Sequence, residues 1–176
     1  MPKLNSTGYI FRFAVAVCIG CSAFVATSAV FLKSKQAQNR RLDIQQNVLR
    51  VADLIEPGQS VNAAQAQQLF DDRIEIQLVN LETKEAVNEA PGIDVASYDQ
   101  VKASADPAMS FTVPPNPSAV TRVQRYAVVY EVYTSPEKDE LDLRIFPIRG
   151  LGLWGTLYGF LALDKDNETI RGITFY

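Results

Sequence analysis

The 176-residue sequence contains no histidine, so it lacks both the commonest general base and the commonest metal ligand. Its only cysteines, Cys18 and Cys21, stand within one apolar run, which leaves the rest of the chain without a disulfide. No cluster of lysine and arginine follows Arg41, and the net charge is −3. Because nucleic-acid-binding domains normally carry a basic patch, this composition argues against a nucleic-acid partner.

One stretch without any charge, Phe13–Leu32, stands near the N-terminus. Its twenty residues would rise about 30 Å as a helix, which matches the hydrocarbon core of a bilayer. Arg12 and Lys33 bracket the stretch, where long cationic side chains reach the headgroups. We therefore predict a transmembrane helix over residues 9–32, after a short N-terminal segment of residues 1–8.

Two features of this stretch leave alternatives open. The small residues Thr27-Ser28-Ala29 suit a signal-peptide cleavage site, although signal peptides usually have a shorter apolar region. Cys18 and Cys21 lie three positions apart and so share one helical face. They are either thiolate ligands of a metal or iron–sulfur centre shared with partner proteins, or small side chains packed between helices. Packing is favoured, because two ligands make only half a site.

Helical patterning continues after the apolar stretch, and we predict juxtamembrane helices over residues 33–69. A helix from Ser34 to about Ile55 is expected to end at Pro57-Gly58, which is a strong stop signal. Asn62 is suited to cap a second, short helix that runs through Phe70.

Strand patterning follows from residue 70 onward and predicts an α+β fold. Apolar and polar residues alternate from Ile74, and Glu82–Glu85 suits a hairpin turn. The proline-rich stretch Ala90–Ala119 is expected to be an irregular surface excursion. Two further strands are predicted over Arg125–Tyr133 and Leu141–Ile148.

The segment Pro147–Tyr176 carries the most specific pattern in the chain. Four glycines surround the only tryptophan, Trp154; they are Gly150, Gly152, Gly155 and Gly159. Apolar runs at Tyr158–Leu163 and Ile170–Tyr176 flank a polar turn. The pattern indicates either a β-hairpin with a buried tryptophan or a turn that binds a flavin or nucleotide. It lacks the third glycine of a dinucleotide fingerprint, and the sequence has no G-K-[ST] of a phosphate loop.

This segment also resembles a known family. PIRGLGLWGTLYGFLAL followed by IRGITFY is similar, in order and spacing, to NqrC, a component of the bacterial Na⁺-translocating NADH:quinone oxidoreductase. FDDRIEIQLVNLET and RYAVVYEVY stand where that family has like segments, and the single N-terminal span agrees as well. The similarity covers essentially the whole chain.

The resemblance implies an α+β protein in which a single transmembrane helix precedes an incomplete mixed-sheet FMN-binding domain at residues 70–176. It implies an electron-transfer subunit of a translocase that couples NADH oxidation by ubiquinone to Na⁺ export. Its partners would be membrane lipid and the other subunits of the complex. The family's flavin domain lies on the periplasmic side of the inner membrane, which implies a cytoplasmic N-terminus over residues 1–8. The excess of lysine and arginine after the span would alone place the flavin domain in the cytoplasm.

The resemblance also suggests site residues. Trp154 is expected to lie against the isoalloxazine ring of FMN, with Gly150, Gly152, Leu153 and Thr156 forming the nearby wall. No catalytic residue and no metal ligand is expected. The family attaches FMN covalently to a threonine in an S-G-A-T motif, which this sequence lacks. The sequence is therefore interpreted as a fragment, or else as a truncated product that cannot hold FMN covalently.

Two alternatives to this function stay open. One is a non-redox, membrane-anchored structural module of an envelope complex. The other is the related flavin subunit of a different electron-transport complex.

Overall fold

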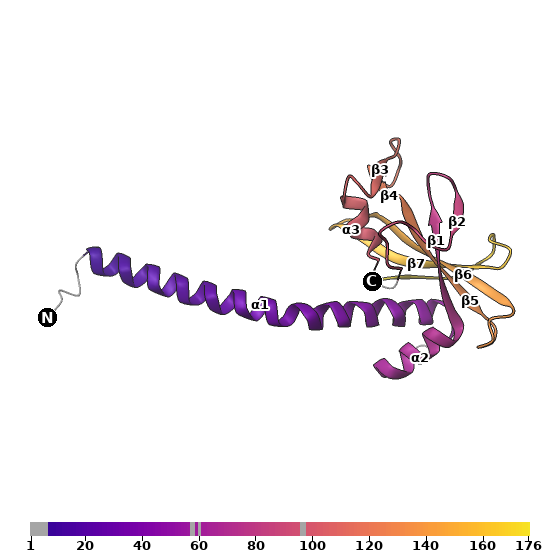
Figure 1. Cartoon of the computed structure of the whole chain (residues 1–176), viewed down its shortest axis with the longest axis horizontal. Coiled ribbons are helices and arrows are strands. Elements are labelled where there is room, and N and C mark those ends of the chain that lie inside the picture. Colours follow the sequence, from indigo (N-terminus) through magenta and orange to yellow (C-terminus); the bar gives the residue numbers. More distant parts are fainter. Residues whose placement is uncertain (1–6, 57–58, 60, 96–97) are drawn as a thin grey trace. The chain divides into compact units, whose positions relative to one another are not determined.

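A single long helix, α1 (Thr7–Val51), begins the part of the chain that the computed structural model describes, residues 7–56, 59, 61–95 and 98–176 (Figure 1). Its apolar stretch is long enough to cross a membrane by length and composition. The Thr27 and Ser28 hydroxyls donate to the carbonyls of Ala23 and Phe24, four residues back, at 2.7 and 2.9 Å. These polar side chains are thus satisfied on the helix itself, as an apolar surrounding requires.

The chain divides into two compact units, Met1–Asp43 and Ile44–Tyr176. The last turns of α1 therefore belong to the same unit as the sheet. That unit also contains residues 44–69, which precede the predicted start of the FMN-binding domain at residue 70.

The C-terminus of α1 lies earlier than expected. The Leu54 N–H donates to the Leu49 carbonyl and the Asp53 N–H to the Arg50 carbonyl, while Asp53 has φ 55°. This pair of bonds around a left-handed residue is a Schellman cap, which ends the helix at Val51. The prediction of a helix to about Ile55 is therefore wrong. The left-handed residue that ends the helix is Asp53, and aspartate is a weaker stop signal in a sequence than glycine or proline. Pro57-Gly58 lies outside the described residues.

The second helix, α2 (Ala63–Arg73), begins where the sequence predicts. The Asn62 side chain accepts from the Gln65 N–H at 2.9 Å, and the Gln65 side chain accepts from the Asn62 N–H at 3.2 Å. This reciprocal capping box confirms Asn62 as the N-cap. The helix continues past Phe70 to Arg73, where the strand dihedrals of Ile74 end it.

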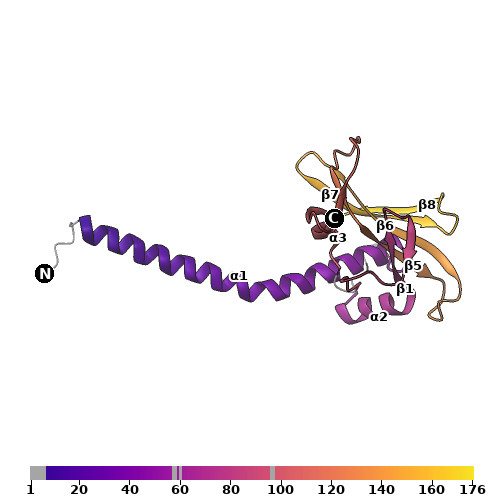
Figure 2. The same cartoon turned by 45° about the horizontal axis from the view of Figure 1, so that its top comes forward.

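Six strands form the main sheet in the order β2-β1-β5-β6-β7-β8 (Figures 1 and 2). The strands are β1 (Ile74–Asn80), β2 (Glu85–Val87), β5 (Tyr126–Tyr133), β6 (Leu141–Leu151), β7 (Thr156–Asp164) and β8 (Ile170–Phe175). The α+β class is confirmed. Every pairing described within this sheet is antiparallel, where a mixed sheet was expected. Short turns join most neighbouring strands, and a short turn returns the chain antiparallel.

The stretch Ala90–Ala119 is more ordered than the sequence indicates. It contains helix α3 (Gln100–Ala105) and strand β3 (Ser110–Thr112), which pairs with β4 (Arg122–Gln124). Asp99 caps α3 by accepting from the Val101 and Lys102 N–H groups at 3.1 and 3.2 Å. Elements of six and three residues are too short to show an apolar period among so many prolines. The expectation of an irregular stretch is therefore wrong for residues 100–105 and 110–112, which form α3 and β3.

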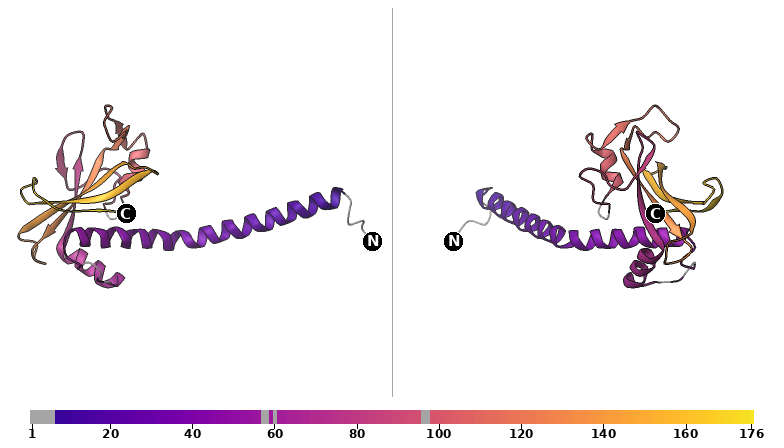
Figure 3. Two further views of the ribbon diagram at one scale, coloured as in Figure 1. Left: turned by 180° about the vertical axis from the view of Figure 1, so that it is seen from behind. Right: turned by 45° about the vertical axis from the view of Figure 1, so that its right-hand side comes forward.

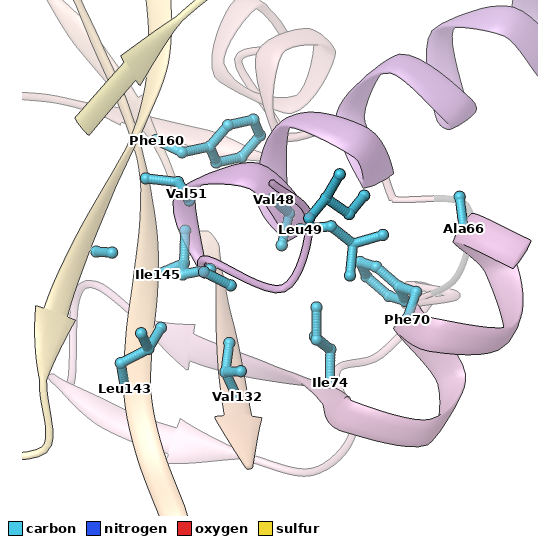
Figure 4. Packing of buried hydrophobic residues seen from close by; sticks show 13 residues of the cluster. Val48, Leu49, Val51, Ala66, Phe70, Ile74, Val132, Leu143, Ile145 and Phe160 are labelled. Carbon is cyan, nitrogen blue, oxygen red and sulfur yellow. The ribbon is translucent and has the colours of Figure 1, made fainter. Parts of the chain in front are cut away.

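One face of the sheet packs on the end of α1 and on α2, and the buried core lies between them (Figure 4). Val48 and Leu49 of α1 are fully buried there, as are Val132 and Ile145 of the sheet. Gly172 of β8 permits a close approach, because a Cβ at that position would lie 3.2 Å from both Cγ2 and the carbonyl oxygen of Val51. The helix end and the strands therefore stabilise each other by apolar burial.

Candidate functional site

The predicted site residues lie together on the hairpin that joins β6 to β7, which the two views of Figure 3 show from further sides. Leu151 pairs with Thr156 at the end of the two strands, and the intervening residues 152–155 make the turn. The Gly152 N–H donates to the Gly155 carbonyl at 2.7 Å and closes this turn. Gly150 precedes Leu151 on β6 and lies opposite Leu157.

The two glycines of β6 and the turn have different roles. A Cβ on Gly152 would lie 2.7 Å from Cγ of Leu157 and 2.9 Å from the Gly155 carbonyl oxygen. Both distances are too short for a real side chain, so this position requires glycine. A Cβ on Gly150 would meet nothing within 4 Å. Gly150 therefore leaves open space above the strand, into which a ligand can approach the backbone.

The turn presents its two largest side chains to solvent. Leu153 is 90% exposed and Trp154 is 96% exposed. The interpretation of Trp154 as a core residue of a plain hairpin is therefore wrong. A fully exposed tryptophan beside an exposed leucine leaves a large apolar surface in water, and such surfaces usually mark a binding site.

Sequence reasoning missed two residues that extend this surface. Leu151 is 69% exposed and Leu157 is 50% exposed, and they flank the turn on the two strands. We call the exposed apolar surface of Leu151, Leu153, Trp154 and Leu157 the hairpin platform. Their sequence positions beside the predicted residues could have suggested them, but only the structure shows that their side chains are exposed.

A row of aromatic rings, which the sequence pattern did not predict, lies across the strands and reaches the core. Phe160 of β7 stacks on Tyr176 with ring centres 5.4 Å apart, and it meets Tyr130 of β5 edge-on at 6.0 Å. Burial raises the pKa of the Tyr130 phenol above its ordinary value, and nearby Tyr176 raises it further. Tyr130 is therefore neutral at physiological pH, and the row contributes packing rather than charge.

Arg149 is the charged residue closest to the platform along β6. Its guanidinium donates from Nη1 to Oγ of Ser104 at 2.5 Å and from Nη2 to the Arg122 carbonyl at 2.6 Å. Thr156, at the start of β7, is exposed, and its hydroxyl makes no side-chain hydrogen bond within the part of the chain that the structure describes. The Thr156 hydroxyl can thus offer a hydrogen-bond donor beside the platform, whereas the Arg149 guanidinium is directed to α3 and β4.

Other parts of the domain offer little chemistry. Among the described residues no three cysteine, aspartate or glutamate side chains are grouped to hold a metal ion. An open cavity of about 320 Å³ lies beside α3, between Ile93, Tyr98 and Met109, and no residue of the hairpin platform lines it. Burial and the neighbouring Asp99 carboxylate raise the pKa of Tyr98 to about 12, and its hydroxyl donates to the Tyr126 carbonyl at 2.8 Å. That tyrosine anchors a loop.

The fold and the hairpin together define a class of protein, an α+β sheet domain that continues from one helix apolar enough to cross a membrane. No protein-family model matches the chain. Similar proteins are known, however. The C subunit of the Na(+)-translocating NADH-quinone reductase of Pseudomonas aeruginosa is 43% identical over all of this chain and 65% of its own length. The corresponding protein of Yersinia pestis is 38% identical over 99% of this chain and 64% of its own length.

A solved structure agrees with these sequences. The crystal structure of NqrC from Shewanella oneidensis matches with a TM-score of 0.65 at 25% identity, over 81% of this chain and 60% of that one. Over its whole length the chain is therefore similar to the C subunits of the Na(+)-translocating NADH-quinone reductase, and its fold is similar to that of NqrC. It spans just under two thirds of the length of these relatives. The resemblance that rested on Pro147–Tyr176 is confirmed.

Proposed function

We propose that this chain is a membrane-anchored electron-transfer subunit of a Na⁺-translocating NADH:quinone reductase. The observation that carries the proposal is the similarity to NqrC of Pseudomonas aeruginosa at 43% identity over the whole chain. The apolar part of α1 supports it by supplying an anchor. In this proposal the sheet domain lies on the periplasmic side of the bacterial inner membrane, and the partners are the other subunits of the complex.

The cofactor in this proposal is FMN, and the platform fits one face of its ring system. Trp154 offers an unobstructed indole surface for offset stacking, and Leu153 extends it with an apolar side chain. Gly150 leaves room for a flat ligand against the strand, Gly152 allows the tight turn that presents Trp154, and the Thr156 hydroxyl can donate to the ligand. When bound, FMN supplies the redox chemistry by accepting electrons and passing them on.

The contribution of the chain itself is to bind, orient and shield. Stacking removes water from one ring face, which strengthens every polar contact at its rim. Arg149 carries a positive charge on the strand that leads into the platform, and a nearby cation favours a reduced, anionic flavin ring over an oxidised, neutral ring. The 176 residues contain no S-G-A-T motif, so the proposal concerns the non-covalent contacts of FMN with these residues.

FMN titration tests the platform directly. FMN added to the full chain in detergent is expected to lose fluorescence on stacking against Trp154, in a saturable manner. Trp154→Ala is expected to abolish the saturable change, and Phe24→Ala in the apolar stretch of α1 serves as the control for FMN that partitions into the micelle. Equal quenching by wild type and Trp154→Ala would remove Trp154 from the site.

Purification tests the place of the chain in a complex. An affinity tag on the chain, expressed in its native bacterium, is expected to bring down further membrane proteins together with Na⁺-stimulated NADH oxidation. Preparations that contain the chain and no such activity would contradict the proposal.

A second candidate is a structural module that docks on other envelope proteins. Exposed apolar side chains along β8 favour it, namely Ile170, Ile173 and Phe175, each of which is more than half exposed. The same purification decides between the two, since a structural module would recover partner proteins without NADH oxidation.

A further inference from the structure

The end of β6 that leads into the platform does not pair with β5, its neighbour in the sheet. β6 pairs with β5 only as far as Ile145, which lies opposite Tyr130. From Phe146 to Leu151, the described backbone pairing of β6 is with β7 alone. The side of β6 that faces away from β7 therefore has no strand ladder there, and side chains must hold it in place.

Arg149 is the residue that bridges this opening. Its two hydrogen bonds reach different elements, since Ser104 lies on α3 and the accepting carbonyl of Arg122 lies on β4. Ser104 is buried at 7% exposure, so it cannot move freely to follow a displaced partner. The planar guanidinium fixes both bonds in one geometry, which a lysine cannot reproduce.

The partners of Arg149 are themselves anchored. Arg122 donates from Nε to Oγ of Ser110 and from Nη2 to the Ser110 carbonyl, both at 3.0 Å. Ser110 is almost completely buried. The chain of bonds therefore runs from the strand that carries the platform into a buried part of the small α3, β3 and β4 region.

Charge pairing does not explain this arrangement. Within the described part of the chain, neither Arg149 nor Arg122 lies within ion-pair distance of a carboxylate, whereas Arg144 on the same strand pairs with Glu131 at 2.9 Å. Both acceptors of Arg149 are neutral oxygens. Directional hydrogen bonds, rather than attraction between charges, set the position of the side chain.

We propose that Arg149 is the positioning residue of the hairpin platform: it ties β6 to α3 and β4 beyond the last β5–β6 pair and so fixes the direction in which Trp154 is presented. The importance of this positioning for flavin binding rests on the proposed function. The claim that Arg149 holds the hairpin in place does not depend on it.

The only tryptophan of the chain reports directly on the platform, so no label is needed. The measurement is the anisotropy decay of Trp154 fluorescence in the full chain in nanodiscs, without flavin. Arg149→Met is expected to increase the nanosecond component of the decay, because the hairpin gains freedom. Arg149→Lys is expected to restore little of the order, since one ammonium cannot make both bonds in the same geometry.

Arg144→Met is the matched control. It removes an arginine from the same strand and breaks a half-buried ion pair, but at a position where β5 and β6 still pair. It is expected to leave the Trp154 decay unchanged. If Arg149→Met fails to fold, Ser104→Ala removes one of the two acceptors from the other side and is expected to loosen Trp154 as well. An unchanged Trp154 decay in Arg149→Met would overturn the proposal. An unchanged decay in Ser104→Ala would do the same where that variant replaces Arg149→Met. An equal change in Arg144→Met would also overturn it.

Flavin binding separates this proposal from the function on which it rests. With FMN as the probe, Arg149→Met is expected to weaken binding roughly tenfold, which corresponds to one or two lost hydrogen bonds that preorganise the site. A wild-type chain that binds no FMN, while Arg149→Met still loosens Trp154, would refute the flavin platform and retain the positioning role.

Discussion

Replacement of Gly152 by alanine tests the geometry of the turn that carries the platform. The new Cβ would lie 2.7 Å from Cγ of Leu157 and 2.9 Å from the Gly155 carbonyl oxygen. Contacts this short force the turn to open and disturb the bond between the Gly152 N–H and the Gly155 carbonyl, which is 2.7 Å long. Overpacking of this kind costs about 1–3 kcal/mol, and we expect the lower part of that range because the turn is exposed and can relax.

Gly150→Ala is the matched control for this prediction. A Cβ there would meet nothing within 4 Å, so the free energy of unfolding should stay the same or rise by up to about 1 kcal/mol, as expected when alanine replaces glycine in a strand. Urea unfolding of the full chain in detergent, followed by circular dichroism, measures both variants, and the Trp154 emission maximum reports on the turn. If the two variants unfold alike, close packing at Gly152 is not what requires glycine.

Three further predictions concern the rest of the domain. Leu49→Ala should lower the free energy of unfolding by about 2–5 kcal/mol, because Leu49 is fully buried in the core; Leu153→Ala should leave it nearly unchanged, and urea titration compares them. Trp154→Ala should unfold like the wild type, since the side chain is exposed, and a clear loss of stability would show that Trp154 is packed. Asp166 accepts from the Glu168 and Thr169 N–H groups, and these bonds lower its pKa from 3.8 to about 2. Its contribution is therefore present above pH 3.8 and lost as the pH falls towards 2, so the difference in thermal midpoint between wild type and Asp166→Ala should shrink over that interval.

Where local signals were strong, the sequence predicted the structure well. The preference of Asn62 for the N-cap is a local signal, and α2 begins where it indicates. Alternation from Ile74 gives β1, because one side of that strand is buried against the core and the other is not. The resemblance of Pro147–Tyr176 to NqrC also needed no structure, since it rests on residue order and spacing.

Where a position depends on distant partners, the sequence was silent or misleading. The left-handed turn at Asp53 ends α1 before the proline-glycine signal, and nothing in the residue type announces it. Helix α3 and strand β3 are too short to show a period, and they are held by bonds such as that from Arg149 to Ser104, 45 positions apart. Nothing in the sequence around Arg149 indicates that its side chain bonds to α3 and β4.

The sequence by itself thus determined the apolar helix, the positions of the main strands along the chain and the similarity to NqrC, because these follow from composition, period and motif along the chain. Only the tertiary structure decided that Trp154 is fully exposed rather than buried. It also decided that Leu151 and Leu157 join it, and that Arg149 spans the gap where β6 leaves β5. The physical reason is that exposure and hydrogen-bond partners depend on which surfaces the fold brings together, and a hairpin motif contains no information on what lies beside it.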